Sequence, residues 1–209
     1  NRFTLRVDAN GAFSRLALDE TRRRLEFLAK LEIHSIEQPL MPRDRDGLAE
    51  LCEDKVLPIA LDESLIGVHS LAERVRLLEH IRPQHLVLKP SLIGGMDSAT
   101  VWSKVAERQG MGWWVTSALE SNLGLSAIAQ WAALQPSVQS EALGLTQGLG
   151  TGGLFTNNIP GNLAIEQGTL LPEMMFTEVV AMVTPEDDQR VVRKLQPVQR
   201  IEQAPHLRV

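Results

Sequence analysis

Two hydrophobic patterns alternate from residue 3 to about residue 143. Short apolar runs that stop at a charged residue, Gly or Pro are typical of buried strands. Longer stretches with an apolar residue every three or four positions are typical of amphipathic helices. The short runs predict six strands, at residues 3–8, 33–37, 59–61, 85–89, 112–116 and 141–145.

The longer stretches predict the helices that connect these strands. The first carries one apolar stripe, formed by Leu18, Leu25, Leu28 and Leu31. Ser70 precedes another, and Glu73 three residues later completes the pattern of a capping box. Further helices are expected at about 44–53, 95–109 and 123–134.

This alternation indicates an α/β fold with parallel strands and crossover helices, either a doubly wound sheet or a (β/α)₈ barrel. A doubly wound sheet concentrates its site at one switch point, whereas a barrel spreads charged residues over successive strand ends. Charged residues close four of the runs here. We therefore predict a TIM-like barrel, incomplete at its N-terminus, with about six βα units corresponding roughly to barrel strands three to eight.

The pattern changes after residue 145. A loop rich in glycine and asparagine leads to LAIEQGTLLPE, which predicts a small hairpin or extended arm, and the tail from Thr184 is charged, with a weak helical pattern at 187–195. We expect residues 1–165 to be the barrel portion and residues 166–209 to be a C-terminal arm and tail.

Composition excludes several classes of function. The net charge of −5 argues against a nucleic-acid partner, because phosphate binding requires a basic face. The single cysteine, Cys52, permits no internal disulfide, and it is expected to be a small buried apolar residue. No apolar run approaches the ~18 residues that a membrane span needs, so no membrane partner is predicted and the cytoplasm is the expected location.

Three of the predicted strands end in carboxylates. Asp8, Glu37 and Asp62 close LRVD, HSIE and IALD, about one βα unit apart. In one parallel barrel these side chains would point into the same rim, and three hard oxygen donors suit Mg²⁺ or, alternatively, Mn²⁺. Any one of them taken alone is more often a helix cap or a loop hydrogen-bonding group. A bound cation would also allow a small anionic substrate in this acidic protein.

Lys89 closes a fourth run, LVLK. A lysine at the end of a buried strand is costly unless it is paired or used, and near a divalent cation its pKa is expected to fall. Such an amine can take up and release protons. The alternative is a lysine whose stem is buried and whose ammonium group reaches solvent.

Two segments near the predicted rim offer groups for a substrate. Ser117 and Ser121 are the first and last residues of the segment SALES, and free N–H groups of the helix that follows could hold a carboxylate. The alternative for Ser121 is a simple helix cap. The glycines in GLGTGG match a dinucleotide fingerprint, but no helix can open at FTNNIPGN, so a glycine-rich substrate loop is the preferred interpretation. The five histidines are scattered, and structural roles are expected for them.

Six motifs in order resemble the barrel domain of the enolase superfamily, from about residue 3 to residue 165. They are VDANGAFS, SIEQPL, IALDESL, LVLKPSLIGG, TSALESNLGLSAIAQ and GLGTGGLF. The greatest resemblance is to the o-succinylbenzoate synthase family, in the muconate-lactonising-type subgroup. This resemblance implies a lyase of menaquinone biosynthesis that uses Mg²⁺. The reaction would be syn dehydration of 2-succinyl-6-hydroxy-2,4-cyclohexadiene-1-carboxylate to 2-succinylbenzoate through an enediolate.

The same resemblance assigns roles to particular residues. Asp8, Glu37 and Asp62 would bind the metal, and Lys89 would be one of two catalytic lysines that face each other across the substrate. The residues implied in substrate contact are Asn10, Ser117, Ser121, Thr151 and Gly152.

The sequence departs from the family pattern in its lysines. The second catalytic lysine belongs to a K-x-K motif, and none occurs among Lys30, Lys55, Lys89, Lys104 and Lys194. We expect a fragment of a longer enzyme, with a degenerate protein as the alternative. As a fragment it should be weakly active or inactive alone, and it could associate with the N-terminal portion or form a homo-oligomer.

Other functions remain open at this point. The nearest are the related lysine-type enzymes: N-acylamino-acid racemase, muconate cycloisomerase and dipeptide epimerase. A dipeptide epimerase usually carries D-x-D in a region that reads EALGLTQGLG here. A non-catalytic barrel fragment that serves only in assembly is the alternative from a different class.

Overall fold

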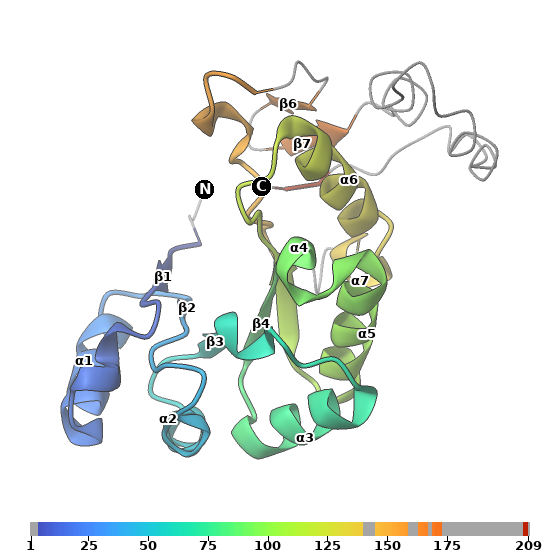
Figure 1. Cartoon of the computed structure of the whole chain (residues 1–209). Coiled ribbons are helices and arrows are strands. Elements are labelled where there is room, and N and C mark those ends of the chain that lie inside the picture. The colour runs from blue at the N-terminus through green and yellow to red at the C-terminus, as the bar shows by residue number, and fades with distance from the viewer. Residues whose placement is uncertain (1–3, 140–144, 159–162, 167–168, 173–206, 209) are drawn as a thin grey trace, which may run out of the picture. The chain divides into compact units, whose positions relative to one another are not determined.

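The computed structural model describes residues 4–139, 145–158, 163–166, 169–172 and 207–208 (Figure 1). Contacts divide the chain into two compact units. The first is Asn1–Ala118 with Leu145–Gln147, and the second is Leu119–Gly144 with Gly148–Val209. The predicted domain division after residue 165 stays a prediction.

The first unit is built on a parallel sheet of five strands in the order β1-β2-β3-β4-β5. The register aligns Asp8 with Glu37 and Ile36 with Ile59. Sequence order and spatial order coincide, as expected when each strand is followed by a crossover to its neighbour. The strands are β1 Arg6–Asp8, β2 Ser35–Glu37, β3 Ile59–Leu61, β4 His85–Leu88 and β5 Gly112–Val115.

The sheet is curled, as contacts between side chains of its first and last strands show. The guanidinium of Arg6 on β1 lies 4.0 Å from the ring centroid of Trp114 on β5. Arg6 also donates a 2.7 Å hydrogen bond to the carbonyl of Thr146. A curled sheet of consecutive parallel strands is part of a barrel, so the predicted fold class is confirmed.

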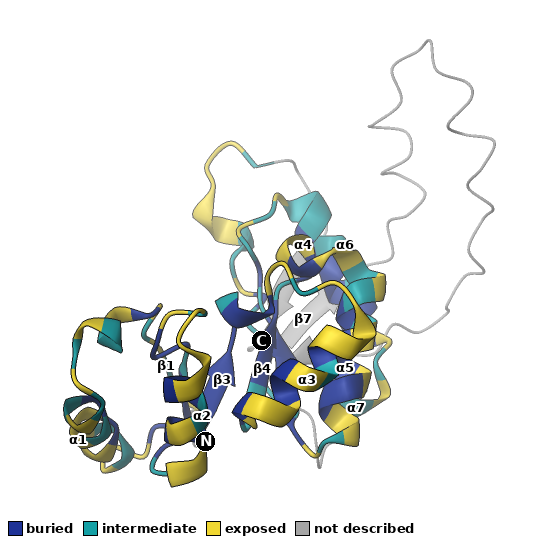
Figure 2. Ribbon diagram, turned by 60° about the horizontal axis from the view of Figure 1, so that its bottom comes forward, coloured by how far each residue is buried: buried dark blue, intermediate teal, exposed yellow. Residues whose placement is uncertain are grey.

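Helices and short 3₁₀ turns connect these strands. Their outer faces are exposed and their inner faces are buried against the sheet, as the burial colours in Figure 2 show. In α1 only Thr21 and Leu25 are fully buried. Leu31 lies beyond the end of α1 and is 53% exposed, so the predicted apolar stripe is too long. The elements are η1 Ala12–Arg15, α1 Leu18–Ala29, α2 Arg45–Asp54, η2 Glu63–Leu65, α3 Leu71–Ile81, α4 Pro90–Ile93 and α5 Gly95–Arg108.

Caps fix where these helices begin and end. Asp44 accepts a hydrogen bond from the Gly47 N–H at the start of α2. Ser70 and Glu73 form the predicted capping box of α3. Lys55 after α2 and Arg82 after α3 take left-handed backbone conformations, which stop each helix and turn the chain toward the next strand.

The core lies between the sheet and its helices. All three residues of β3 are fully buried, and so are Trp102 of α5 and Trp114 of β5. Cys52 is buried at 2% exposure, as predicted. Burial raises the pKa of its thiol to about 12, which leaves it in the unreactive protonated form.

The second unit contains α6 Asn122–Ala133, α7 Pro136–Gln139 and η3 Gly152–Leu154. It also holds a three-stranded antiparallel sheet of β6 Leu163–Glu166, β7 Thr169–Pro172 and β8 Leu207–Arg208. The pairing of β6 with β7 confirms the predicted hairpin. The predicted strand at 141–145, except for its last residue, and the predicted helix at 187–195 lie outside the described residues. No helix in the described part of the chain is long and apolar enough to cross a membrane.

Candidate metal and acid–base site

Four charged residues stand at the carboxyl ends of neighbouring strands in the first unit. Asp8 and Glu37 are the last residues of β1 and β2, and they pair in register. Asp62 directly follows β3, and Lys89 directly follows β4. Because the strands are parallel and adjacent, all four residues lie at one edge of the sheet, as the sequence predicts.

Lys89 joins two of the carboxylates. Its ammonium group donates a short hydrogen bond to Oδ2 of Asp62 and lies 3.4 Å from Oε1 of Glu37. The three side chains are largely withdrawn from solvent, with exposures of 18% for Lys89, 12% for Glu37 and 2% for Asp62. This pairing is inconsistent with the alternative in which the Lys89 head simply reaches solvent.

The pKa shifts show how strongly these groups interact. Burial alone would lower the pKa of Lys89, but its hydrogen bond to Asp62 and the charges of Asp62 and Glu37 outweigh burial and raise it. The pKa of Glu37 is raised to about 8, chiefly by burial and by the nearby Asp62 carboxylate, with Lys89 acting in the opposite direction. One ammonium group therefore does not fully neutralise the carboxylates at these strand ends. Lys89 itself holds its proton tightly.

Gln38 fixes the position of Asp62, a role that the sequence pattern does not predict. It is 1% exposed, and its Oε1 accepts 3.2 Å hydrogen bonds from the N–H groups of Asp62 and Ser64. Its Nε2 donates to the Leu40 carbonyl at 2.7 Å and to Ser64 Oγ at 2.9 Å. The amide thus fixes the backbone that carries Asp62. The only signal in the sequence is a polar residue between Glu37 and Pro39, directly after a predicted strand.

Asp8 is arranged differently from the other two carboxylates. It is exposed, and its Oδ1 accepts a 2.9 Å hydrogen bond from the N–H of Asn10, whose φ is 47°. Within the residues that the structure describes, no three side chains of Asp, Glu, His or Cys are grouped as a metal centre. Glu37 and Asp62, two of the three predicted ligands, both contact the Lys89 ammonium group. The third, Asp8, is their neighbour on β1.

The predicted substrate residues fall in both units. Asn10 and Ser117 belong to the first unit, where Ser117 is 8% exposed shortly after β5. Ser121, Thr151 and Gly152 belong to the second. Ser121 occupies the N-cap position of α6 without a capping hydrogen bond from its side chain. The Oγ1 atom of Thr151 is buried with no hydrogen-bond partner in the described part of the chain.

Asn158 connects the glycine-rich loop to the start of α6. Its Oδ1 accepts from the Asn122 N–H at 2.8 Å, and its Nδ2 donates to Asn122 Oδ1 at 2.9 Å and to the Gly152 carbonyl at 3.2 Å. The first N–H of α6 is therefore already taken by the protein, and the expectation that free N–H groups there hold a carboxylate stays a prediction. Nothing in the sequence marks this pair, whose members lie 36 residues apart.

A family model described as "Enolase C-terminal domain-like" matches residues 1–177. The chain belongs to this family. The resemblance inferred from the six motifs is thereby confirmed, and the curled parallel sheet is the corresponding part of the barrel in this family.

The chain is also similar to individual curated proteins and solved structures. The chain is 50% identical over 167 residues to the o-succinylbenzoate synthase of Desulfotalea psychrophila, covering 79% of this chain and 42% of that protein. The crystal structure of MenC from the same organism aligns with a TM-score of 0.73 at 48% identity, covering 80% of this chain and 44% of the other. A hydrophobic dipeptide epimerase of Roseobacter litoralis is 31% identical over 156 residues, covering 74% of this chain and 43% of that protein. In these comparisons the chain spans less than half the length of its relatives.

Proposed function

We propose that this chain supplies the metal ligands and one catalytic lysine of an o-succinylbenzoate synthase. The observation that carries the proposal is the Lys89 ammonium group held between Glu37 and Asp62 at the ends of adjacent parallel strands. The 50% identity to an o-succinylbenzoate synthase supports this choice of substrate within the family.

The residues present fit a divalent cation. Asp8, Glu37 and Asp62 are hard oxygen donors at one edge of the sheet, which is the donor type that Mg²⁺ prefers, with Mn²⁺ as the alternative. The raised pKa of Glu37 reflects burial and unneutralised negative charge, which a cation would relieve. Asp8 would leave the Asn10 N–H to join the other two. When bound, the metal would supply positive charge that stabilises the enediolate of the substrate carboxylate.

Lys89 would then move protons. With a cation held by Glu37 and Asp62, Lys89 would lose the partners that raise its pKa, and its amine would then be able to act as a base. Abstraction of the proton α to the substrate carboxylate breaks a C–H bond and leaves the electron pair in the enediolate. The ring C–O bond then breaks, hydroxide takes the abstracted proton and leaves as water, and the ring becomes aromatic. A second lysine from outside this sequence would face Lys89 across the substrate, and which of the two abstracts the proton stays open.

The remaining assignments belong to the same proposal. Asn10 and Ser117 from the first unit, and Ser121, Thr151 and Gly152 from the second, would contact a small anionic substrate. The substrate-binding barrel portion would be residues 1–165, with residues 166–209 as an arm. The holoenzyme would need the K-x-K lysine, supplied by another portion of the enzyme.

The second candidate function is that of a related lysine-type enzyme of the same family. The 31% identity to a dipeptide epimerase favours it. Epimerases and racemases also abstract a proton α to a carboxylate, so the site on β1–β4 would serve them equally well. The segment EALGLTQGLG lacks the D-x-D that dipeptide epimerases usually carry, which favours dehydration over dipeptide epimerisation.

A chimaeric enzyme tests the proposal. The matched 42% of the Desulfotalea psychrophila o-succinylbenzoate synthase is replaced by this chain, and dehydration, racemisation of N-succinyl amino acids and epimerisation of dipeptides are measured with Mg²⁺. We expect dehydration to dominate and to be lost in Lys89→Ala, with Lys104→Ala as the matched control. A folded chimaera that racemises or epimerises but does not dehydrate would overturn the assignment of substrate.

A further inference from the structure

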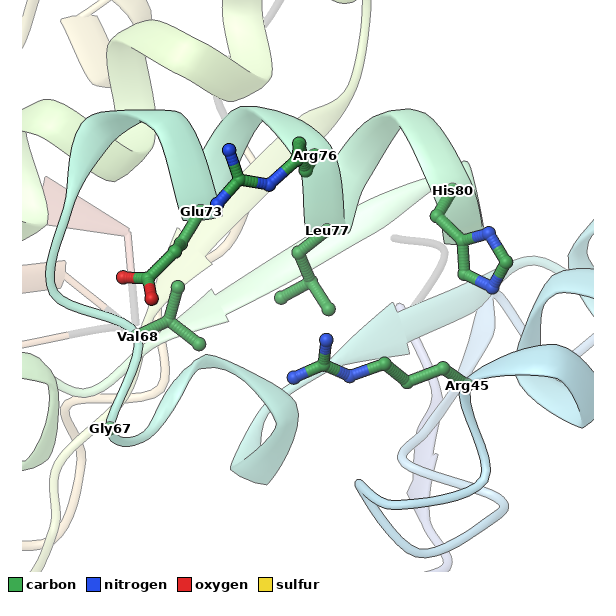
Figure 3. Close-up of a pocket in the computed structure, with 7 residues that line it drawn as sticks. All are labelled: Arg45, Gly67, Val68, Glu73, Arg76, Leu77 and His80. Atoms are coloured by element: carbon green, nitrogen blue, oxygen red, sulfur yellow. The ribbon is translucent and has the colours of Figure 1, made fainter.

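A hollow outside the strand-end site lies between the start of α2 and the outer face of α3. It measures about 430 Å³ and is lined by Arg45, Gly67, Val68, Glu73, Arg76, Leu77 and His80. Figure 3 shows Val68 and Leu77 pointing into the space between α3 and the loop at Gly67, while Arg45 reaches in from α2. A volume of this size is within the range of small-molecule pockets.

The two arginines in this hollow are available to a ligand. Within the part of the chain that the structure describes, neither Arg45 nor Arg76 makes a hydrogen bond or a close ion pair, and both side chains are exposed. Some other exposed arginines on the same unit have partners, such as Arg23 and Arg24, which both pair with Glu20. The hollow therefore offers two guanidinium groups on one concave surface, neither of them within ion-pair distance of a carboxylate in the described residues.

The acidic residues on either side of Arg45 in the sequence, and Glu73 in the lining of the hollow, already have other partners. Asp44 accepts from the Gly47 N–H, Asp46 lies 2.9 Å from His80 Nε2, and Glu73 accepts from Ser70 in the capping box. The hydrogen bonds from Ser70 lower the pKa of Glu73, with a smaller contribution from the charge of Arg76. Each carboxylate thus has a structural partner, and none of them closes on Arg45.

We propose that this hollow binds a small organic anion in which a phosphate or carboxylate group is attached to an apolar body. The guanidinium groups of Arg45 and Arg76 would hold the anionic group, since their planar forks match both oxyanions. Val68 would contact the apolar body, and Leu77, which is 3% exposed, also lines the hollow. The site is separate from the edge formed by Asp62 and Lys89, although Gly67 and Val68 belong to the segment that connects η2 to α3.

Titration calorimetry on the purified chain tests this site. Phenyl phosphate and phthalate are the probes, one for each oxyanion, and inorganic phosphate tests the need for an apolar body. We expect saturable binding of at least one organic probe, tighter than inorganic phosphate. Arg45→Ala and Arg76→Ala should each weaken it on the order of tenfold, which corresponds to about 1.4 kcal/mol.

The control is Arg43→Ala, which removes the same charge two positions away from Arg45 and outside the lining. Its affinity should stay within about twofold of the original chain, and Mg²⁺ binding should be unaffected by all three substitutions. Melting temperatures confirm that each variant is folded, and Arg45→Lys gives a second, more conservative variant. The proposal is overturned if neither organic probe saturates, or if Arg43→Ala weakens binding as much as Arg45→Ala does.

Discussion

Lys89 donates a hydrogen bond to the carboxylate of Asp62, 27 residues earlier and at the end of the neighbouring strand. The contact places an ammonium group where the family resemblance places a metal ion. The Lys89 ammonium group and the proposed metal ion thus compete for the same carboxylates.

Mg²⁺ should raise the melting temperature of the chain. A ligand that binds only the folded state stabilises it by about 2.7 kcal/mol at a hundredfold excess over its Kd. For a protein of this size, that corresponds to several degrees. Asp62→Asn should abolish the effect, whereas Asp97→Asn, an exposed aspartate in the first turn of α5, should retain it. A thermal melt with and without Mg²⁺ measures this, and equal shifts in both variants would refute the metal assignment.

Gln38→Ala should destabilise the first unit strongly. It would leave the N–H groups of Asp62 and Ser64 buried without their acceptor. Each such loss costs about 1–3 kcal/mol, so the free energy of unfolding should fall by about 2–6 kcal/mol. Urea denaturation measures the change. Gln109→Ala, at the end of α5, serves as the control and should change stability by less than about 1 kcal/mol.

The contribution of His85 to the stability of the first unit should be lost as pH drops from about 6.5 to about 4. Burial, together with the charges of His34 and Arg6, lowers the pKa of His85 to about 4. At this position the unfolded chain binds a proton at a higher pH than the folded chain does, so this contribution is fully present above pH 6.5 and is lost progressively below it. The raised pKa of Glu37 acts in the opposite direction between about pH 8 and pH 4.5, so the contribution of His85 is measured as the difference between the chain and a variant without this histidine. The loss from His85 is at most about 3 kcal/mol.

Urea denaturation at pH 7, 5.5 and 4.5 checks this contribution. Relative to the unsubstituted chain, His85→Phe, which keeps an aromatic ring beside Trp114, should gain stability as pH falls, while His69→Phe at an exposed position should not. His34 also has a lowered pKa, caused chiefly by burial, and adds a dependence of the same sign, which Glu37 opposes. An unchanged slope in His85→Phe would show that this histidine does not carry the effect.

The strand ends were predictable because each of four segments combines an apolar run of strand length with a charged last residue. These segments are LRVD, HSIE, IALD and LVLK. Parallel order then brings Asp8, Glu37, Asp62 and Lys89 to one edge without further information. Gln38 and Asn158 were not predictable, because their roles arise from hydrogen bonds to backbone groups 24 to 36 residues away. Periodicity also could not show where α1 ends, and so it counted the exposed Leu31 as core.

The cluster of Arg6, His34, His85 and Trp114 was likewise hidden in the sequence. These residues belong to β1, β4, β5 and the segment before β2, and only the curl of the sheet brings them together. Gly112 permits the approach, since a Cβ there would lie 2.5 Å from His85 Nδ1. The histidines were expected to be structural, and their contacts with Trp114 agree with such a role.

The central claim is that Glu37 and Asp62 bind a divalent cation in competition with Lys89. Titration calorimetry of Mg²⁺ into the chain, Lys89→Met and Asp62→Asn tests it most directly. Removing the ammonium group should tighten Mg²⁺ binding on the order of tenfold, because the ion no longer displaces a charge from the carboxylates. Asp62→Asn should remove measurable binding. Equal affinities in all three proteins, or weaker binding in Lys89→Met, would contradict the account.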